Sequence, residues 1–185
     1  MHAIVALDRP IAYTGEQLRS LWLYETFGAA GDAIAVFAGP CAVAGDRLVD
    51  TEDRLAGDSI EAASMLHIII EHFGDDLERA VLRQRLLIAI IKDELTQMGV
   101  ERLLRRGDDL YRDERKLTVS IATKSPVSTL IHTGINIDPA GAPVAACGLA
   151  EFGLDHTDCA QRIAEAYRGE IAAAQFACVK VRGVP

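Results

Sequence analysis

The chain has 185 residues, of which half are hydrophobic and a quarter charged, a composition typical of one soluble globular domain. Acidic residues outnumber basic ones and give a formal net charge of −8, which argues against nucleic-acid binding because a phosphate-tracking surface carries a basic excess. The longest apolar runs, LLIAII and HIII, are too short to cross a bilayer. The start, MHAIVALDRPIAYTG, lacks the pattern of a secretory signal. We therefore expect a cytoplasmic single domain over residues 1–185, with no membrane or nucleic-acid partner.

The N-terminal part predicts a strand, a helix and a second strand. AIVAL at 3–7 is typical of a short buried strand. Thr14 and Gln17 form a T-x-x-Q capping box that predicts a helix start, and Gly28 predicts its end. GDAIAVFAGP predicts a strand over 33–38 that a Gly-Pro pair ends.

The middle of the chain predicts a long loop and then two helices. The acidic stretch CAVAGDRLVDTEDRLAGD has no helical periodicity and predicts a loop with a short strand around 47–49. Asp58 and Glu61 resemble an N-cap pair at the start of a helix through SIEAASMLHIIIEHF. Asp75 and Glu78 resemble a second such pair, starting a helix that ends at Gly99. We therefore expect an αα-hairpin with a very short turn.

Strands dominate the remaining sequence until a C-terminal helix. Strands are predicted at 110–111, 116–123 and 129–137, with VAACGL as a last strand, and a helix begins near Asp155 or Thr157. Strands and helices do not alternate strictly. The order therefore favours an α+β fold with a largely antiparallel or mixed sheet packed by helices.

Polar side chains on two of these strands form the candidate ligand site. Alternation along the first strand puts three polar residues on one face: Lys116, Thr118 and Ser120. On the later strand His132, Gly134 and Asn136 share a face. If the strands pair, Lys116, His132 and Asn136 line one surface, and Gly134 leaves room for a ligand. A lysine ammonium there suits a carboxylate or phosphate, whereas the alternative is a half-exposed sheet whose polar face meets water.

Two further groups of residues are candidates for metal chemistry. Asp108 and Asp109 precede the lysine strand and can hold a metal or hydroxyl groups. His67 and Glu71 would share a face of the predicted helix, with His72 nearby, but HIIIEH matches neither known zinc pattern. Histidines satisfied within a packed helix are the alternative. The four cysteines form no C-x-x-C pair and predict buried reduced thiols: Cys41, Cys147, Cys159 and Cys178.

Almost the whole chain resembles a family of archaeal and bacterial proteins called domain of unknown function 366. The segments that carry this resemblance are YTGEQLRSLW, FAGPCAV, MLHIIIEHF, RQRLLIAI, GDDLYRDERKLTVSIA and SPVSTLIHTGINI. This family brings no assigned activity with it.

A second resemblance is to the catalytic core of biotin and lipoate protein ligases, and it rests on GDDLYRDERKLTVSIA…LIHTGINID. It places Asp109 at the ligases' aspartate and Arg115–Lys116 at their Arg-Lys pair, and it implies that Lys116 contacts the substrate carboxylate and the acyl-adenylate. The implied fold is related to class II aminoacyl-tRNA synthetases. Gly39 lies in the acidic stretch AGPCAVAGDRLVDTED, which stands where the ligases have a glycine-rich adenylate loop. Acidic side chains near a phosphate require Mg²⁺.

Three functions follow from these patterns. The resemblance implies a protein that binds a small carboxylic acid, an acyl-adenylate or a nucleotide, as an ATP-dependent ligase or acyltransferase with ATP and Mg²⁺, using Lys116 as the catalytic residue. The implied ligand-binding residues are Asp108, Asp109, Arg115, His132, Gly134, Asn136 and Gly39. The first alternative is a non-catalytic ligand-binding or homo-oligomeric assembly protein, whose MLHIII and LLIAII faces are shared between subunits. The second alternative is a metal-dependent hydrolase built on His67, Glu71 and His72.

Overall fold

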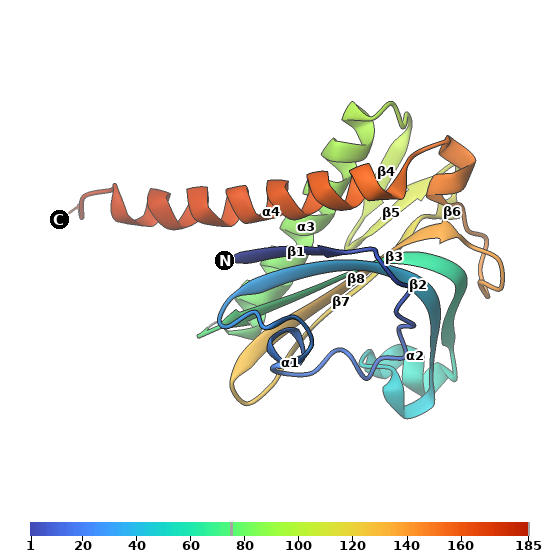
Figure 1. Ribbon diagram of the computed structural model, residues 1–185, viewed down its shortest axis with the longest axis horizontal. Helices are drawn as coiled ribbons and strands as arrows, with labels where there is room; N and C mark the ends of the chain where they lie inside the picture. The colour runs from blue at the N-terminus through green and yellow to red at the C-terminus, as the bar shows by residue number, and fades with distance from the viewer. Residues whose placement is uncertain (75, 185) are drawn as a thin grey trace.

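The computed structural model describes residues 1–74 and 76–184 and centres on a five-stranded mixed sheet (Figure 1). The strand order is β1-β2-β3-β8-β7, with β1 and β2 parallel and every other neighbouring pair antiparallel. The strands are β1 (His2–Ala6), β2 (Ala33–Ala44), β3 (Ser59–Phe73), β7 (Thr118–Lys124) and β8 (Ser128–Asp138). The predicted α+β class with a mixed sheet is confirmed.

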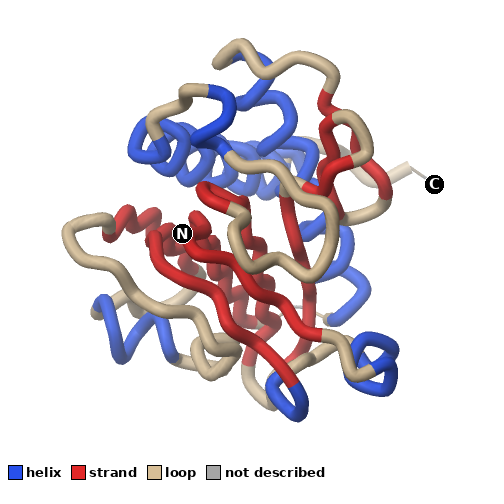
Figure 2. The backbone as a smooth tube through the Cα atoms, turned by 90° about the vertical axis from the view of Figure 1, so that its right-hand side faces the viewer, coloured by secondary structure: helices blue, strands red, loops and turns tan. Residues whose placement is uncertain are grey.

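A smaller sheet and four α-helices complete the described elements. The smaller sheet contains β4 (Leu103–Arg106), β5 (Asp109–Arg112) and β6 (Arg115–Lys116). The helices are α1 (Trp22–Phe27), α2 (Thr51–Ala56), α3 (Leu77–Gln97) and α4 (His156–Val179), with 3₁₀ turns at Gly45–Arg47 and Leu149–Phe152. Figure 2 shows the strands side by side, with helices and connecting segments on both sides of them.

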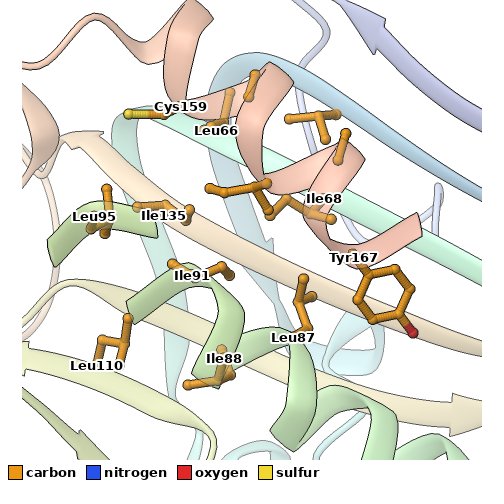
Figure 3. Packing of buried hydrophobic residues seen from close by; sticks show 14 of the residues in the cluster. Leu66, Ile68, Leu87, Ile88, Ile91, Leu95, Leu110, Ile135, Cys159 and Tyr167 are labelled. Carbon is orange, nitrogen blue, oxygen red and sulfur yellow. The ribbon is translucent and has the colours of Figure 1, made fainter. Parts of the chain in front are cut away.

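Helices α3 and α4 cover one face of the large sheet (Figure 1). Ile68 of β3 and Ile135 of β8 meet Ile91 of α3 in a fully buried core (Figure 3). Each such isoleucine contributes about 1.5–3 kcal/mol by burial. The Tyr167 ring of α4 closes the same core. This packing fixes the sheet from which the candidate site is built.

The opposite face is covered by the N-terminal segment rather than by a long helix. Residues 11–13 run alongside β2 with a parallel bridge between Tyr13 and Cys41, where Tyr13 N–H donates to the carbonyl of Pro40 at 2.9 Å. Trp22 and Phe37 pack with Ile69 in a second buried cluster. The central strands are therefore packed against apolar side chains on both faces.

The helix predicted over SIEAASMLHIIIEHF is wrong, because this segment is β3, the central strand of the sheet. Residues Met65–Ile70 are at most 1% exposed, since both faces of β3 are covered. A strand buried on both faces loses the polar–apolar alternation that would reveal it. Without that period, an apolar run cannot be distinguished from a buried helix. The αα-hairpin prediction fails with it.

Half of the predicted capping box forms, and the helix begins later than expected. Thr14 N–H donates to Oε1 of Gln17 at 3.0 Å, yet α1 starts only at Trp22. Leu21 has φ 65°, and its N–H donates to the buried carboxylate of Glu71 at 2.9 Å. This tertiary contact holds the chain out of helical conformation ahead of α1. Gly28 ends the helix as predicted.

Strand β2 continues six residues further than predicted, through the Gly-Pro pair to Ala44. A β-bulge between Gly39 and Cys41 accommodates Pro40, as is usual for proline within a sheet. The acidic stretch after it is not a plain loop, since it contains α2, whose N-cap Asp50 accepts from the N–H of Glu52 at 2.8 Å.

The long helices largely match their predictions. Helix α3 has Asp76 as its N-cap, while the predicted cap Asp75 lies outside the described residues. Helix α4 begins after Asp155 as expected. VAACGL forms no strand and makes a single bridge from Ala146 to Lys116. Within residues 1–74 and 76–184, no helix is both long and apolar enough to cross a membrane.

Candidate functional site

A cavity of about 430 Å³ lies on the sheet face opposite α3 and α4. Its floor includes Met65 of β3 with His132 and Asn136 of β8. The stretch from Arg47 to Glu61 supplies one wall, and Lys116 lies at another. The cavity therefore joins segments that are far apart in the sequence.

Lys116 enters the cavity as half of a shielded ion pair. Its Nζ lies 2.8 Å from Oδ2 of Asp109, and the two side chains are 29% and 15% exposed. Burial alone would lower the pKa of Lys116, but the Asp109 carboxylate outweighs it and raises the pKa above its usual value. Burial raises the pKa of Asp109, and the ammonium only partly offsets that effect. Lys116 stays protonated at neutral pH and can hold an anionic group of a ligand.

The backbone fixes Lys116 from both sides. Its N–H donates to the carbonyl of Ala145 at 2.9 Å, and its carbonyl accepts from Cys147 N–H at 3.0 Å. Nδ2 of Asn136 also donates to the Lys116 carbonyl at 3.2 Å. The role of Asn136 in the structure is thus to hold the lysine strand against β8.

Carboxylates outnumber cations around the cavity. Two cations line it, Lys116 and Arg47, and Arg47 pairs with Glu16 at 2.5 Å. The lining carboxylates are Asp50, Asp53, Asp58, Glu61, Asp108 and Asp109. Burial and the charges of Asp50 and Asp58 raise the pKa of Asp53. The cavity as a whole favours a ligand that brings positive charge or hydrogen-bond donors along with any anionic group.

Two buried histidines lie beneath the cavity, stacked with an aromatic ring. Nδ1 of His67 is 3.2 Å from Nε2 of His132. Burial lowers the pKa of His67 to about 4, and burial together with His67 holds the pKa of His132 well below its usual value. The ring of Tyr13 stacks on that of His132 with 3.7 Å between centroids. Both imidazoles are therefore neutral at pH 7.

Five residues predicted for the site line the same cavity: Lys116, Asp108, Asp109, His132 and Asn136. Arg115 does not line it and instead pairs with Glu151 at 2.7 Å. Asp108 accepts from Nε2 of Gln84 at 2.9 Å. The predicted group is brought together in the fold, with Arg115 directed elsewhere.

The two predicted glycines serve packing rather than an open ligand surface. A Cβ atom at Gly39 would lie 2.2 Å from the main-chain oxygen of Ile11. A Cβ atom at Gly134 would lie 3.0 Å from Cε of Met65. Gly39 thus admits the close approach of the N-terminal segment, and Gly134 admits a side chain of the cavity floor.

Of the two residues expected to share a face with Lys116, Ser120 lines the cavity with it, whereas Thr118 is fully buried and does not line it. Strand β6 ends at Lys116 and β7 begins at Thr118, so alternation is not carried through Leu117, which is buried on the helix side. The Ser120 hydroxyl lies 2.8 Å from that of Thr133.

The predicted metal group is also dispersed, because a strand replaces the helix. On β3, Glu71 and His72 point to opposite faces. Glu71 accepts from the Ser128 hydroxyl at 2.6 Å, and Nδ1 of His72 lies 2.9 Å from Asp32. Within the described part of the chain, no three His, Cys, Asp or Glu residues are arranged to hold a metal ion.

Sequence reasoning missed Tyr13 and the acidic wall of the cavity. Tyr13 follows a proline-containing segment without periodicity, so nothing in the sequence places it on the sheet. The acidic composition of residues 46–58 was visible, but only the cavity shows what it faces.

Comparison with known proteins shows the family to which this chain belongs. A family model described as "Domain of unknown function (DUF366)" matches residues 1–182. The chain belongs to this family. An uncharacterised protein of Methanocaldococcus jannaschii is 37% identical over 178 residues, which are 92% of this chain and 80% of that protein. The resemblance found in the sequence is confirmed.

Two solved structures extend the comparison to the fold. A protein of unknown function from Pyrococcus horikoshi superposes with a TM-score of 0.95 at 41% identity, over 100% of both chains. A biotin protein ligase variant from Aquifex aeolicus, in complex with biotin, superposes with a TM-score of 0.61 at 14% identity, over 91% of this chain and 70% of that chain. The predicted likeness to the ligase catalytic domain is confirmed as a likeness of fold.

Proposed function

We propose that the cavity binds a small carboxylic acid, or the acyl-adenylate formed from it, with the anionic group beside Lys116. The observation that carries this proposal is the Lys116 ammonium at the wall of a 430 Å³ cavity. The ammonium has three donors, of which Asp109 engages one at 2.8 Å. The biotin ligase fold supports the same class of ligand by analogy.

The chemistry that this site supports is electrostatic. A ligand carboxyl or acyl oxygen beside Lys116 would be stabilised as negative charge develops on it, because the lysine is held by its backbone before the ligand arrives. Enclosure on three sides would orient the acid. A ligase or acyltransferase reaction of this kind needs no protein nucleophile.

A nucleotide would enter this cavity only with Mg²⁺, since six carboxylates line it. The described residues do not form a three-ligand metal cluster. Mg²⁺ is usually bound by phosphate oxygens and water together with one or two carboxylates. Asp53 and Asp109, which line the cavity, would supply these carboxylates. Its contribution would be to neutralise phosphate charge.

Thermal unfolding with and without ligands tests the proposal. We would screen biotin, lipoate and fatty acids, each alone and with ATP and Mg²⁺. An acid at 100 times its Kd stabilises the folded state by about 2.7 kcal/mol, so a clear rise in Tm is expected. The rise should disappear in Lys116→Ala and persist in Lys124→Ala, a matched lysine that is exposed at the end of β7. No rise with any of these acids contradicts the proposal.

A second proposal, assembly into a homo-oligomer, is favoured by α4. Figure 1 shows this helix running past the rest of the molecule towards the C-terminus. Phe176 and Val179 are 63% and 78% exposed on the projecting part. The MLHIII and LLIAII faces cannot serve this role, because they lie inside the chain's own core. Light scattering should give more than one chain per particle for the native protein and a smaller mass for Phe176→Ser; a native monomer contradicts the proposal.

A further inference from the structure

The two buried histidines form a hydrogen-bonded chain that begins at a main-chain carbonyl. Nε2 of His67 lies 3.2 Å from the carbonyl oxygen of Gly39. A carbonyl oxygen only accepts, so this nitrogen of His67 must carry the proton. The other nitrogen of a neutral imidazole has a lone pair and no proton. Nδ1 of His67 is therefore an acceptor.

The tautomer of His67 fixes the tautomer of His132, its neighbour in the series of hydrogen bonds. Nδ1 of His67 faces Nε2 of His132 at 3.2 Å, so Nε2 of His132 must donate the proton between them. Both rings are neutral at pH 7, since burial lowers the pKa of each. The lone pair of His132 is thereby assigned to its remaining nitrogen, Nδ1.

Nδ1 of His132 has no hydrogen-bond partner among residues 1–74 and 76–184. Over the same residues, Arg112 Nε is the single fully enclosed side-chain nitrogen or oxygen without a partner, so Nδ1 of His132 retains some accessible surface. His132 lines the cavity and is only 3% exposed. This surface is accordingly reached from the cavity. An acceptor so buried is costly to leave unpaired, and a donor in the cavity would satisfy it.

The charges around the cavity favour the same kind of ligand group. Asp109 already engages Lys116, and Glu16 engages Arg47. Asp53, Asp58 and Glu61 add negative charge to the wall. These carboxylates favour a ligand group that has N–H donors, whether that group is neutral or positively charged.

We propose that the cavity recognises an N–H group of its ligand through Nδ1 of His132, which His67 and Gly39 fix as a hydrogen-bond acceptor. This inference takes the carboxylate of the ligand from the proposed function and rests on it. It adds that the ligand is a carboxylic acid that also carries an amide, ureido or ammonium nitrogen. Acids whose remainder is hydrocarbon or a dithiolane ring lack this donor and bind less well. His132 is the residue that determines this specificity.

The first test is ¹⁵N NMR of the histidine rings in the native full-length protein at pH 7. We expect His132 and His67 both to be protonated at Nε2 and unprotonated at Nδ1. A proton on Nδ1 of His132, or a charged ring, overturns the inference. Because this measurement needs no substitution, it does not depend on whether a variant folds.

The second test uses probe pairs that differ by a single N–H. One pair is 6-acetamidohexanoate and its N-methylated form, and the other is N-methylacetamide and N,N-dimethylacetamide. We expect the N–H member of each pair to shift the His132 Nδ1 signal and to bind about tenfold more tightly, the effect of one hydrogen bond. 6-Aminohexanoate then distinguishes a charged donor from a neutral one.

The outcomes separate this inference from the proposed function. Acids that bind equally well with and without the N–H leave an acid site but overturn the role of His132. Small amides that shift Nδ1 while no acid binds support the role of His132 and overturn the acid site. If none of the four probes shifts Nδ1, the inference is wrong.

A matched pair of variants completes the test. His132→Phe keeps a ring stacked on Tyr13 and removes the acceptor, whereas His72→Phe makes the same change at a buried histidine of β3 that does not line the cavity. The preference for the N–H probe should vanish in the first variant and persist in the second. A preference that survives in His132→Phe, with the fold intact by circular dichroism, overturns the inference.

Discussion

The backbone of Ile11 lies against Gly39 of strand β2, so that a Cβ atom at position 39 would lie 2.2 Å from the main-chain oxygen of Ile11. This contact is held by the N–H of Ile11, which donates to the carbonyl of Ala38 at 2.9 Å. This approach leads the N-terminal segment to Tyr13, which stacks over His132 beside the cavity. A single glycine in β2 therefore decides where one side of the candidate site lies.

We predict that Gly39→Ala destabilises the protein by at least about 1–3 kcal/mol, the usual cost of overpacking, because the backbone of Ile11 must move. Urea unfolding measures the change. Gly169→Ala is the matched control: it lies within α4 with no atom within 4 Å of the added Cβ, so it should stabilise by about 0.5–1 kcal/mol. Equal stability of Gly39→Ala and the native protein would show that Ile11 does not lie this close to Gly39 in solution.

The second prediction concerns a buried hydrogen-bonded chain that ties α4 to the sheet. Nδ1 of His72 lies 2.9 Å from Asp32, and its Nε2 lies 3.0 Å from the Tyr167 hydroxyl. Tyr167→Phe should lower the free energy of unfolding by about 1–3 kcal/mol, because the buried imidazole loses this partner. Tyr24→Phe, at a 53% exposed tyrosine, should change it by less than about 0.5 kcal/mol. A similar small effect from both substitutions would refute the prediction.

The third prediction is a pH dependence of stability that arises from the paired histidines. The unfolded chain binds a proton at His67 with a pKa near the ordinary 6.5, whereas the folded protein does so only at a pKa of about 4. The unfolded state therefore holds more protons as pH falls from about 6.5 to about 4, and the free energy of unfolding decreases across that window. His67 alone accounts for a loss of about 3 kcal/mol, and His132 acts in the same direction.

Urea titrations at several pH values between 7.5 and 4.5 check this dependence. His67→Gln removes one of the two titrating rings and should show a shallower loss of stability over the same range, even though it is less stable at pH 7. A native protein whose stability is constant from pH 6.5 to pH 5 is incompatible with two neutral buried imidazoles.

The fourth prediction concerns the cysteines. Three of them are buried, and burial raises the pKa of Cys41 to about 12 and that of Cys159 to about 11. Cys178 is exposed on the projecting end of α4, which corrects the expectation that all four are buried. A thiol reagent should therefore modify one cysteine quickly in the native protein and four in denaturant. Cys178→Ser should abolish the fast reaction, and a fast reaction that remains would contradict the burial of the other three.

The sequence predicted elements well where a local signal was sufficient. The start of α4 follows from a capping aspartate, and β8 follows from alternation near Asn136. The sequence failed at β3, where Ile68, Ile69 and Ile70 are buried on both faces and carry no period. β-Branched residues in succession favour a strand. The helix was predicted instead because Asp58 and Glu61 have the spacing of an N-cap pair.

The candidate site was predicted in part for the same physical reason. Asp109 and Lys116 are close in the sequence, and their 2.8 Å pair is formed within the small sheet. His67 was a candidate metal ligand or a satisfied buried histidine on the sequence alone, since no local pattern points to its partner His132, 65 residues away. Only strand pairing between β3 and β8 brings the two rings together.

What the sequence by itself determined is the set of locally encoded features: the acidic charge, the starts of α3 and α4, the strands β7 and β8, and the family. The tertiary structure decided how the strands pair, which faces are buried, which glycines admit a close backbone approach, and which nitrogen of His132 keeps its lone pair. These features depend on contacts between segments distant in the chain, and such contacts are set by packing and by the need to satisfy buried polar groups rather than by any local pattern.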